Sequence, residues 1–403
     1  MKKKLFSLGL AVAMAASLTA CGGSGTAGTT KAAETTAADK AGAADNAAAG
    51  GVIKIGGIGP TTGGAAVYGL AVQHGAQLAV DEINAAGGIN GCTIEFNFQD
   101  DEHDPEKSVS AYNTLKDWGM QALMGTVTSG PCIAVADKTA ADNMFQITPS
   151  GSAVECAANP NVFRICFSDP DQGAASAKYI GENKLATKIA VIYDSSDIYS
   201  SGIFEKFAEE AANQGLEIVA AEAFTADSNK DFSTQLQKAK DAGAELVFLP
   251  IYYTEASLIL QQADKAGFET QFFGCDGMDG ILQVENFDTS LAEGLMLLTP
   301  FAADATDDLT VNFVKSYKDA YNEVPVQFAA DAYDAIYALK AAMEDANVTA
   351  GMDASAICDA LKASMLNMKL DGLTGEGMTW TDDVEPQKAP KAVKVVDGAY
   401  AAM

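Results

Sequence analysis

Residues 52–99 decide the fold, and they read VIKIGGIGPTTGGAAVYGLAVQHGAQLAVDEINAAGGINGCTIEFNFQ. Val52–Ile55, which reads VIKI, is typical of a strand, and residues 66–85 repeat apolar positions at helical spacing. A tight Asn90-Gly91 turn then precedes residues 93–98, which alternate in polarity as a half-buried strand does. This stretch therefore predicts a strand, a helix and a second strand.

The same alternation continues and then begins again. Asp104-Pro105 predicts the start of another helix, because proline fits the first helical turn, and residues 122–125 form the next strand. A second series runs from Lys188 to Gly274, with helices expected at residues 201–213, 231–241 and 255–266. Since a parallel crossover needs a helix-length return, this order predicts an α/β fold of two doubly wound domains.

Helical patterns at residues 309–322 and 328–345 follow the second series, and we expect them to pack back on the first domain. The two domains are then discontinuous in sequence and joined by a multi-strand hinge. The N-terminal lobe is predicted to contain residues 52–169 and 299–375, and the C-terminal lobe residues 170–298 and 376–403. Because ligands of open α/β sheets lie outside the carboxyl ends of the strands, we expect a cleft between the lobes.

The composition excludes several classes of function. The chain has 403 residues, with 54 acidic and 26 basic side chains and a formal net charge of -28. Such a negative field repels phosphate backbones, which argues against nucleic-acid binding. With only 2 histidines, and with Arg164 as the one arginine, histidine catalysis and phosphate transfer have few residues to draw on. We expect no cofactor and no metal site.

The first 21 residues have the layout of a signal peptide. Lys2–Lys4 precede an uncharged, largely apolar run from Leu5 to Ala20, which is shorter than the roughly 20 residues of a spanning helix. The sequence Leu18-Thr19-Ala20-Cys21 resembles a bacterial lipobox, which implies that Cys21 becomes the lipidated first residue. Residues 22–50 are rich in Gly, Ala, Ser and Thr and predict a flexible tether. We therefore expect an exported protein anchored to the outer face of the bacterial cytoplasmic membrane; an ordinary secretory signal is the alternative.

Six further cysteines follow Cys21: Cys92, Cys132, Cys156, Cys166, Cys275 and Cys358. An exported location permits disulfide bonds, but six cysteines allow about 15 pairings and none of them has metal-ligand spacing. A local bridge between Cys156 and Cys166 is the expected pairing. Free buried thiols are the alternative.

Three serines follow the predicted strands of the first series. After the strand that ends at Gly125, Ser129 or Gly130 can cap the next helix, where free N–H groups and the helix dipole favour a carboxylate. Ser150 and Ser152 follow the next strand and can add further donors. A plain helix cap and a surface turn are the alternative interpretations.

The second series brings aromatic rings and an acid to the same edge. Tyr199 and Tyr252 follow two strands, and Asp276 follows the strand at residues 271–274. Aromatic faces can line an apolar pocket, and Asp276 can neutralise an ammonium group. Core packing and an ordinary turn acid are the alternatives. A carboxylate seat on one lobe and an acid on the other predict a receptor for a zwitterion.

Several segments together carry a resemblance to a known family. They are Val67-Tyr68-Gly69, Asp81–Gly91, Asp100-Asp101 with Asp104-Pro105, Ile147-Thr148-Pro149, Arg164 with Asp169–Gly173, and Lys230-Asp231-Phe232. From about Val52 to Lys394 the chain resembles the leucine, isoleucine and valine binding proteins of bacterial ABC importers, with the type I periplasmic binding protein fold and its Venus-flytrap architecture. The resemblance implies a monomeric, non-enzymatic receptor that closes over an amino acid and delivers it to an ABC permease.

Position by position, the resemblance implies that Ser129, Ser150 and Ser152 hold the head group and that Asp276 opposes the ammonium. The residues implied to surround the side chain are Tyr68, Tyr199, Tyr252 and Phe328. Ser152 stands where well-known members carry Thr, and Asp276 where they carry Glu, which leaves the preferred side chain open. Some relatives have a disulfide between the positions that are His103 and Thr128 here, so that bond is absent.

Other functions remain as alternatives. The same fold could take another small amino acid, an aromatic amino acid or an amide. An NAD-type oxidoreductase would use Gly57-Ile58-Gly59 after the first strand, but Pro60 interrupts that loop and Asp100 lies about twice as far downstream as the usual roughly 20 residues. A purely structural surface lipoprotein is the third class, and a ligand test separates it from a receptor.

Overall fold

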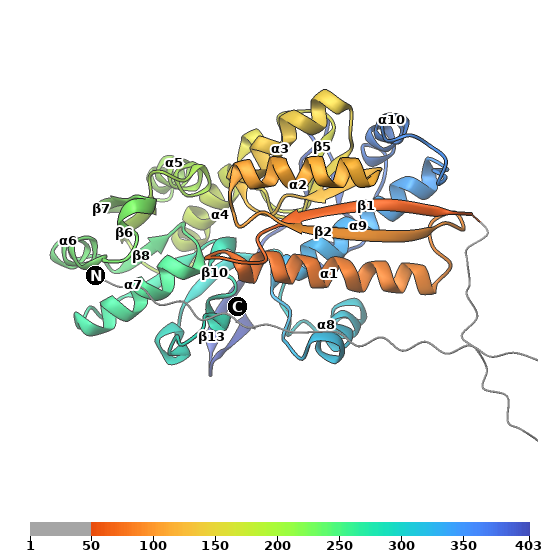
Figure 1. The fold of residues 1–403 in the computed structure, drawn as a ribbon. Coiled ribbons are helices and arrows are strands. Elements are labelled where there is room, and N and C mark those ends of the chain that lie inside the picture. Colours follow the sequence, from red (N-terminus) through yellow and green to blue (C-terminus); the bar gives the residue numbers. More distant parts are fainter. Residues whose placement is uncertain (1–49) are drawn as a thin grey trace, which may run out of the picture. The chain divides into compact units, whose positions relative to one another are not determined.

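The computed structural model describes residues 50–403 (Figure 1). The predicted signal peptide, the lipidation site Cys21 and nearly all of the predicted tether lie outside these residues. Two largely parallel sheets follow one another along the described chain, and helices lie against them. The predicted class, an α/β fold of two doubly wound units, is confirmed. None of the helices within residues 50–403 is long and apolar enough to cross a lipid bilayer.

The first sheet is entirely parallel and has the strand order β2-β1-β3-β4-β5. Its strands are β1 (Val52–Gly59), β2 (Thr93–Asp100), β3 (Ala122–Gly125), β4 (Gln146–Thr148) and β5 (Val162–Arg164), and the helices between them are α1 (Ala66–Ala85), α2 (Pro105–Trp118) and α3 (Ser129–Asp142). The winding reverses between β1 and β3. The loops that follow these two strands therefore leave a crevice at the carboxyl edge of the sheet.

The second sheet repeats this plan and adds an antiparallel hairpin, in the order β14-β13-β10-β9-β8-β6-β7. Its strands are β6 (Lys188–Asp194), β7 (Glu217–Phe224), β8 (Leu246–Leu249), β9 (Gln271–Gly274), β10 (Met296–Thr299), β13 (Lys391–Val396) and β14 (Ala399–Ala402), with helices α4 (Asp169–Glu182), α5 (Ile198–Asn213), α6 (Ser233–Asp241) and α7 (Tyr253–Lys265). The winding reverses between β6 and β8, which gives this sheet a crevice as well.

Three later helices return to the first sheet. They are α8 (Asp308–Tyr321), α9 (Gln327–Asp345) and α10 (Ala354–Met365); α8 and α9 pack on α1, and α10 packs on α9 and β3. The chain therefore crosses between the sheets three times: after β5, after β10, and between α10 and β13, where β11 (Thr379–Trp380) pairs with β12 (Pro386–Gln387). These crossings form the predicted multi-strand hinge.

We call the first sheet with α1–α3 and α8–α10 the first lobe, and the second sheet with α4–α7 the second lobe. Residues 50–403 belong to one compact unit, in which buried side chains of both sheets share one apolar cluster. The residue limits predicted for the two lobes stay a prediction.

Local sequence signals explain where individual elements begin. The Asp104 carboxylate accepts the N–H groups of Glu106 and Lys107 at 2.9 Å each, with Pro105 in the first helical turn, as predicted for α2. Helix α5 begins at Ile198 rather than at residue 201, because the side chain of Asp197 caps it. This earlier start places Tyr199 on the first turn of α5 instead of in a loop.

Gly57 and Gly59, which carry the dinucleotide-binding alternative, lie inside β1 rather than in a phosphate-binding loop. A side chain at Gly57 would overlap Phe98, and one at Gly59 would overlap Val127. These glycines are explained by close packing within the first lobe. The interpretation of this segment as a dinucleotide loop is therefore wrong.

The expected Cys156–Cys166 bridge is also wrong, because all six cysteines of the described chain are free and buried. Cys156 lies against Cys132, and its Sγ is 3.6 Å from the carbonyl oxygen of Ser129. Cys166 instead interacts with the charges of Arg164 and Asp331. The two thiols therefore lie in different surroundings, and the alternative of free buried thiols holds.

Candidate functional site

All eight side chains predicted to bind a ligand line one cavity between the two lobes. Tyr68, Ser129, Ser150, Ser152 and Phe328 come from the first lobe, and Tyr199, Tyr252 and Asp276 from the second. Most of them follow the carboxyl ends of strands beside the two reversals of winding, as the sequence predicts. The structure thus brings these residues together, and their role in binding stays a prediction.

Two serine hydroxyls of the first lobe, those of Ser129 and Ser152, donate no hydrogen bond within the described chain. Ser129 Oγ accepts the N–H groups of Ser152 and Ala153 at 3.2 and 3.1 Å, so its own hydrogen is unused. Ser150 Oγ donates to the carbonyl of Val127 at 2.7 Å. Ser152 Oγ is buried beside the carboxylate of Asp169 but forms no well-aligned hydrogen bond within residues 50–403. Because these groups lie beside the N-terminus of α3, they suit a carboxylate.

Thr128, rather than Ser129 or Gly130, is the residue that flanks the start of α3. Its hydroxyl lies 2.8 Å from His103 Nδ1. Burial lowers the pKa of His103, which favours the neutral imidazole. The ring of His103 packs edge-on against Tyr252, with centroids 5.6 Å apart, and Thr128 itself lines the cavity.

Arg164 stabilises the loop that carries Ser150 and Ser152, which we call the serine loop. Its guanidinium is fully buried and donates to the carbonyls of Gly151, Ser152 and Ala153 at 3.2, 2.6 and 3.1 Å. Its Nε lies 3.2 Å from a carboxylate oxygen of Glu385, so the charge is partly balanced. Sequence reasoning assigned no role to Arg164, although a lone arginine in an apolar strand could have signalled one.

Asp276 is held by hydrogen bonds to its side chain and its backbone. Its Oδ1 accepts from Tyr199 Oη at 2.7 Å, and the same hydroxyl accepts the N–H of Gly277 at 2.9 Å. Two glutamines that the sequence did not reveal, Gln172 and Gln327, contact the Asp276 backbone N–H and C=O at 3.2 and 2.8 Å. Burial raises the pKa of Asp276 to about 6, although the Tyr199 hydrogen bond opposes the shift. An ammonium group would compensate this buried acid.

A second acid, Asp169, lies between the loop that carries Ser150 and Ser152 and the wall that carries Asp276. Its backbone N–H donates to the Ser152 carbonyl at 2.9 Å, and its carboxylate has no hydrogen-bond partner among the described residues. The position of Gly202 leaves room for this carboxylate, because a Cβ there would lie 3.3 Å from Asp169 Oδ2. Burial raises the pKa of Asp169 well above its usual range; the neighbouring Ser152 hydroxyl opposes the shift, and the negative charge of Asp276 adds to it.

Four aromatic rings form the rest of the wall. Tyr199 and Tyr252 stack at a centroid distance of 4.8 Å, and Tyr68 lies 4.4 Å from Phe328 and 5.6 Å from Tyr252. These rings provide an apolar surface next to the polar head-group site. Tyr199 has a further role that the sequence did not predict, since its hydroxyl orients Asp276.

Tyr68 also joins the two lobes. Its hydroxyl donates to the carbonyl of Gly277 at 2.5 Å and accepts the N–H of Tyr253 at 3.2 Å. The cavity that remains has a volume of about 10 Å³, roughly the room for one water molecule. The structure therefore shows the lobes in a closed arrangement.

Comparisons with known proteins give a consistent result. The sequence profile of a family described as "Periplasmic binding protein" matches residues 52–399. The chain is 32% identical over 306 residues to "Leu/Ile/Val-binding protein homolog 3" of Brucella melitensis, covering 75% of this chain and 81% of that one. It is 29% identical over 308 residues to the "Leucine-, isoleucine-, valine-, threonine-, and alanine-binding protein" of Pseudomonas aeruginosa, covering 76% and 81%.

Among solved structures, the chain is similar to the branched-chain amino acid transporter substrate binding protein LivJ from Streptococcus pneumoniae, solved in complex with isoleucine. The TM-score is 0.79 and the identity 30%, over 87% of this chain and 98% of that chain. The likeness therefore extends over both lobes.

Proposed function

The chain belongs to the periplasmic binding protein family, and from this premise we propose that it is an extracytoplasmic receptor for an amino acid, which it delivers to an ABC permease. The observation that carries the proposal is the placement of the Ser129 and Ser152 hydroxyls on one lobe and the buried Asp276 carboxylate on the other, in one cavity. These groups match the two charges of a zwitterion.

Each charge of the ligand meets a different lobe. The carboxylate binds Ser129, Ser152 and the N-terminus of α3, where hydrogen-bond donors and the helix dipole favour an anion. The ammonium binds Asp276, whose orientation Tyr199 fixes. Because the ligand bridges the lobes, its binding free energy favours the closed arrangement.

The order of events follows from the size of the cavity. Its volume of about 10 Å³ neither admits nor holds an amino acid, so the lobes must part for the ligand to enter and must close less tightly around it than in this structure. The lobes then close over it, and the closed receptor presents a composite surface to the permease. No bond of the ligand is broken in this cycle, so the protein acts as a receptor and not as an enzyme.

The side chain of the ligand lies against Tyr68, Tyr252 and Phe328, which favours an apolar group. The similar protein of Brucella melitensis is named for leucine, isoleucine and valine, that of Pseudomonas aeruginosa also for threonine and alanine, and LivJ was solved with isoleucine. We propose leucine, isoleucine and valine as the ligands. Another small amino acid, an aromatic amino acid or an amide is the alternative. One methylene changes discrimination by only about 1 to 3 kcal/mol, so the ranking needs measurement.

The N-terminal sequence places the receptor at the membrane. We propose that Cys21 is lipidated and that residues 22–50 tether a monomeric body to the outer face of the cytoplasmic membrane. Metabolic labelling with a palmitate analogue, in the native chain and in Cys21→Ala, tests this anchor. Equal labelling of both forms would refute it.

The ligand is tested by a thermal-shift screen of the purified protein against the twenty amino acids. Leucine, isoleucine and valine should raise the melting temperature, because a ligand that binds only the folded form stabilises it. N-acetyl-leucine, which lacks the ammonium, serves as the matched control and should give no shift. If no amino acid shifts the transition, the proposal fails and the structural lipoprotein is favoured.

A further inference from the structure

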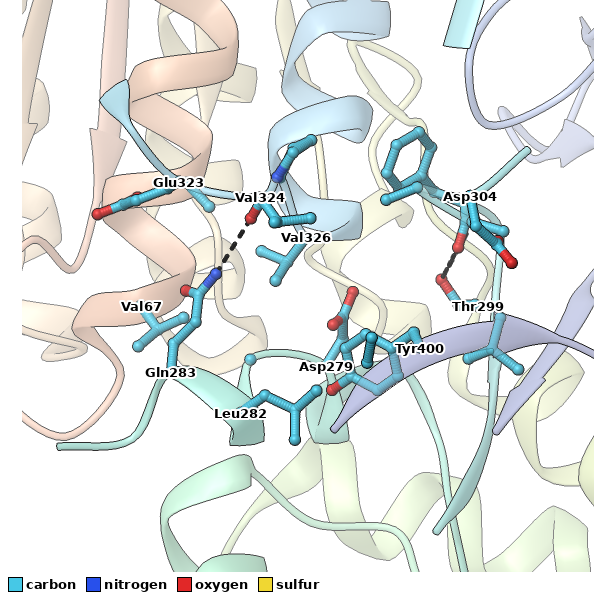
Figure 2. Close-up of a pocket in the computed structure, with 18 of the residues that line it drawn as sticks. Val67, Asp279, Leu282, Gln283, Thr299, Asp304, Glu323, Val324, Val326 and Tyr400 are labelled. Carbon is cyan, nitrogen blue, oxygen red and sulfur yellow. Dashed lines mark hydrogen bonds between the residues drawn. The ribbon is translucent and has the colours of Figure 1, made fainter. Parts of the chain in front are cut away.

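A second cavity lies beside the hinge and is much larger than the first (Figure 2). It has a volume of about 770 Å³, within the range of small-molecule sites. Its wall combines the start of α1, the segment after β9, the crossing after β10, the loop between α8 and α9, and the β13–β14 hairpin. Both lobes and one hinge segment therefore contribute to it.

Most of the wall is apolar, and its charged groups are mainly acidic. Val67, Leu282 and Val326 are among the apolar side chains that face the cavity (Figure 2). The charged lining residues are Asp279, Asp304 and Glu323, opposed by Lys318. A cation with an apolar body suits this wall better than an anion does.

Asp279 supplies a specific anchor inside the cavity. The residue is only 5% exposed, and its Oδ2 accepts the N–H of Gln327 at 2.7 Å. Its carboxylate lies next to the Tyr400 hydroxyl on the same wall, although within the described chain Asp279 Oδ1 and Tyr400 Oη form no well-aligned hydrogen bond. An ammonium group at this pair would be a better partner for the carboxylate than the poorly aligned hydroxyl.

The same short segments form a wall between this cavity and the amino-acid cavity. Asp276 lines the amino-acid cavity, and Asp279, three residues later, lines the hinge cavity. Likewise, Phe328 lines the amino-acid cavity and Val326 lines the hinge cavity. Gln327 lies between them, and its Nε2 and backbone N–H bind the Asp276 carbonyl and the Asp279 carboxylate.

We propose that the hinge cavity is an effector site for an apolar amine without a carboxylate, whose ammonium binds Asp279 and whose body fills the apolar space. A free amino acid is disfavoured there, because its carboxylate would face three acids. The site is thus selective for the class of compound that the amino-acid cavity, which requires both charges, does not hold.

The effect on the first site follows from the closed arrangement. The cavity wall joins the lobes, and Gln283 Nε2 of the second lobe donates to the Val324 carbonyl of the first at 3.2 Å (Figure 2). An amine that fits this wall favours the arrangement in which the wall is complete. It should therefore raise the affinity for the amino acid, and linkage requires the amino acid to raise amine affinity by the same factor. This coupling rests on the proposed function.

The test uses 3-methylbutylamine as the probe in titration calorimetry on the purified protein, with and without saturating leucine. One equivalent should bind in both cases. The matched probes 3-methylbutan-1-ol and 3-methylbutanoate, which have the same carbon skeleton without the cation, should bind at least about tenfold more weakly. Saturating amine should tighten leucine binding about fivefold or more.

Two variants locate the amine. Asp279→Asn keeps an oxygen for the Gln327 N–H but removes the charge, and should weaken amine binding about 10- to 100-fold, the loss of one charged hydrogen bond. Ala303→Trp fills the cavity and should abolish amine binding even if Asp279→Asn perturbs folding. Asp308→Asn, an exposed acid on α8 outside the cavity lining, is the matched control and should leave the amine affinity unchanged.

The outcomes separate the two proposals. Competition between the amine and leucine, or equal amine affinity in Asp279→Asn, Ala303→Trp and the parent protein, would overturn the effector site. Unchanged leucine affinity at saturating amine would overturn the coupling. Amine binding through Asp279 in a protein that binds no amino acid would instead leave the hinge site standing and remove the proposed function.

Discussion

The two walls of the amino-acid cavity hold their polar groups in different ways. On the first lobe, several donors from Ser129, Ser152 and the start of α3 share one task, and Arg164 supports their loop from below. On the second lobe a single carboxylate, Asp276, faces the cavity with Tyr199 as its support. The carboxylate site should therefore tolerate the loss of one hydrogen-bond donor, whereas the ammonium site should not tolerate the loss of its one negative charge. This asymmetry can be measured.

The largest effect is expected beneath the serine loop. Arg164→Met leaves the carbonyls of the loop without donors and Glu385 without its partner, which should lower the free energy of unfolding by about 3 to 5 kcal/mol. Chemical denaturation monitored by circular dichroism measures it. Lys178→Met, at an exposed site, should change stability by less than about 0.5 kcal/mol. A similar small change for both would show that the loop does not depend on Arg164.

On the opposite wall, Asp276→Asn removes the only charge assigned to the ammonium and keeps the shape of the side chain. Leucine binding should weaken by about 2 to 5 kcal/mol, because the buried ammonium loses its charged partner. Titration calorimetry measures the change, and Asp308→Asn is the exposed control. Unchanged affinity would show that Asp276 does not bind the ammonium, and the proposed difference between the two walls would be wrong.

The same substitution should have the opposite effect on the free protein. The pKa of Asp276 is raised from 3.8 to about 6, so the folded protein binds this proton more tightly than the unfolded chain does. The free energy of unfolding therefore falls as the pH rises from about 4 to about 6. In Asp276→Asn this carboxyl group is absent, so its titration no longer lowers the free energy of unfolding. Relative to the parent, the variant should gain on the order of 3 kcal/mol between about pH 4 and pH 7. Denaturant titrations of ligand-free protein at both pH values measure it; a pH-independent difference would contradict the shift.

The smallest effect is expected for Ser129→Ala. The substitution removes one hydroxyl donor, but it also frees the N–H groups of Ser152 and Ala153, which can then bind the carboxylate directly. Leucine affinity should fall by only about 0.5 to 1.5 kcal/mol. A loss in calorimetry as large as that of Asp276→Asn would show that the first lobe also depends on a single group.

Much of the fold and site could be predicted because both follow from repeated local patterns. Alternating strands and helices set the two sheets, and the carboxyl ends of parallel strands bring loops such as those of Ser150 and Asp276 to one cleft. The family resemblance added Tyr68 and Phe328, which lie on helices and follow no strand directly.

What the sequence did not reveal depends on contacts between distant segments. Gln172 and Gln327 are ordinary polar residues until the fold brings them to the Asp276 backbone. The thiols of Cys156 and Cys166 are close in sequence, yet their neighbours in space differ. The hinge cavity is assembled from five separate parts of the chain, so no single motif indicates it.

The hydrogen bonds of Tyr68 have a kinetic consequence. The hydrogen bonds of Tyr68 to Gly277 and Tyr253 join the lobes, so where they persist around a bound amino acid they must break before it can leave. The residence time of the amino acid is then limited by how often these hydrogen bonds break.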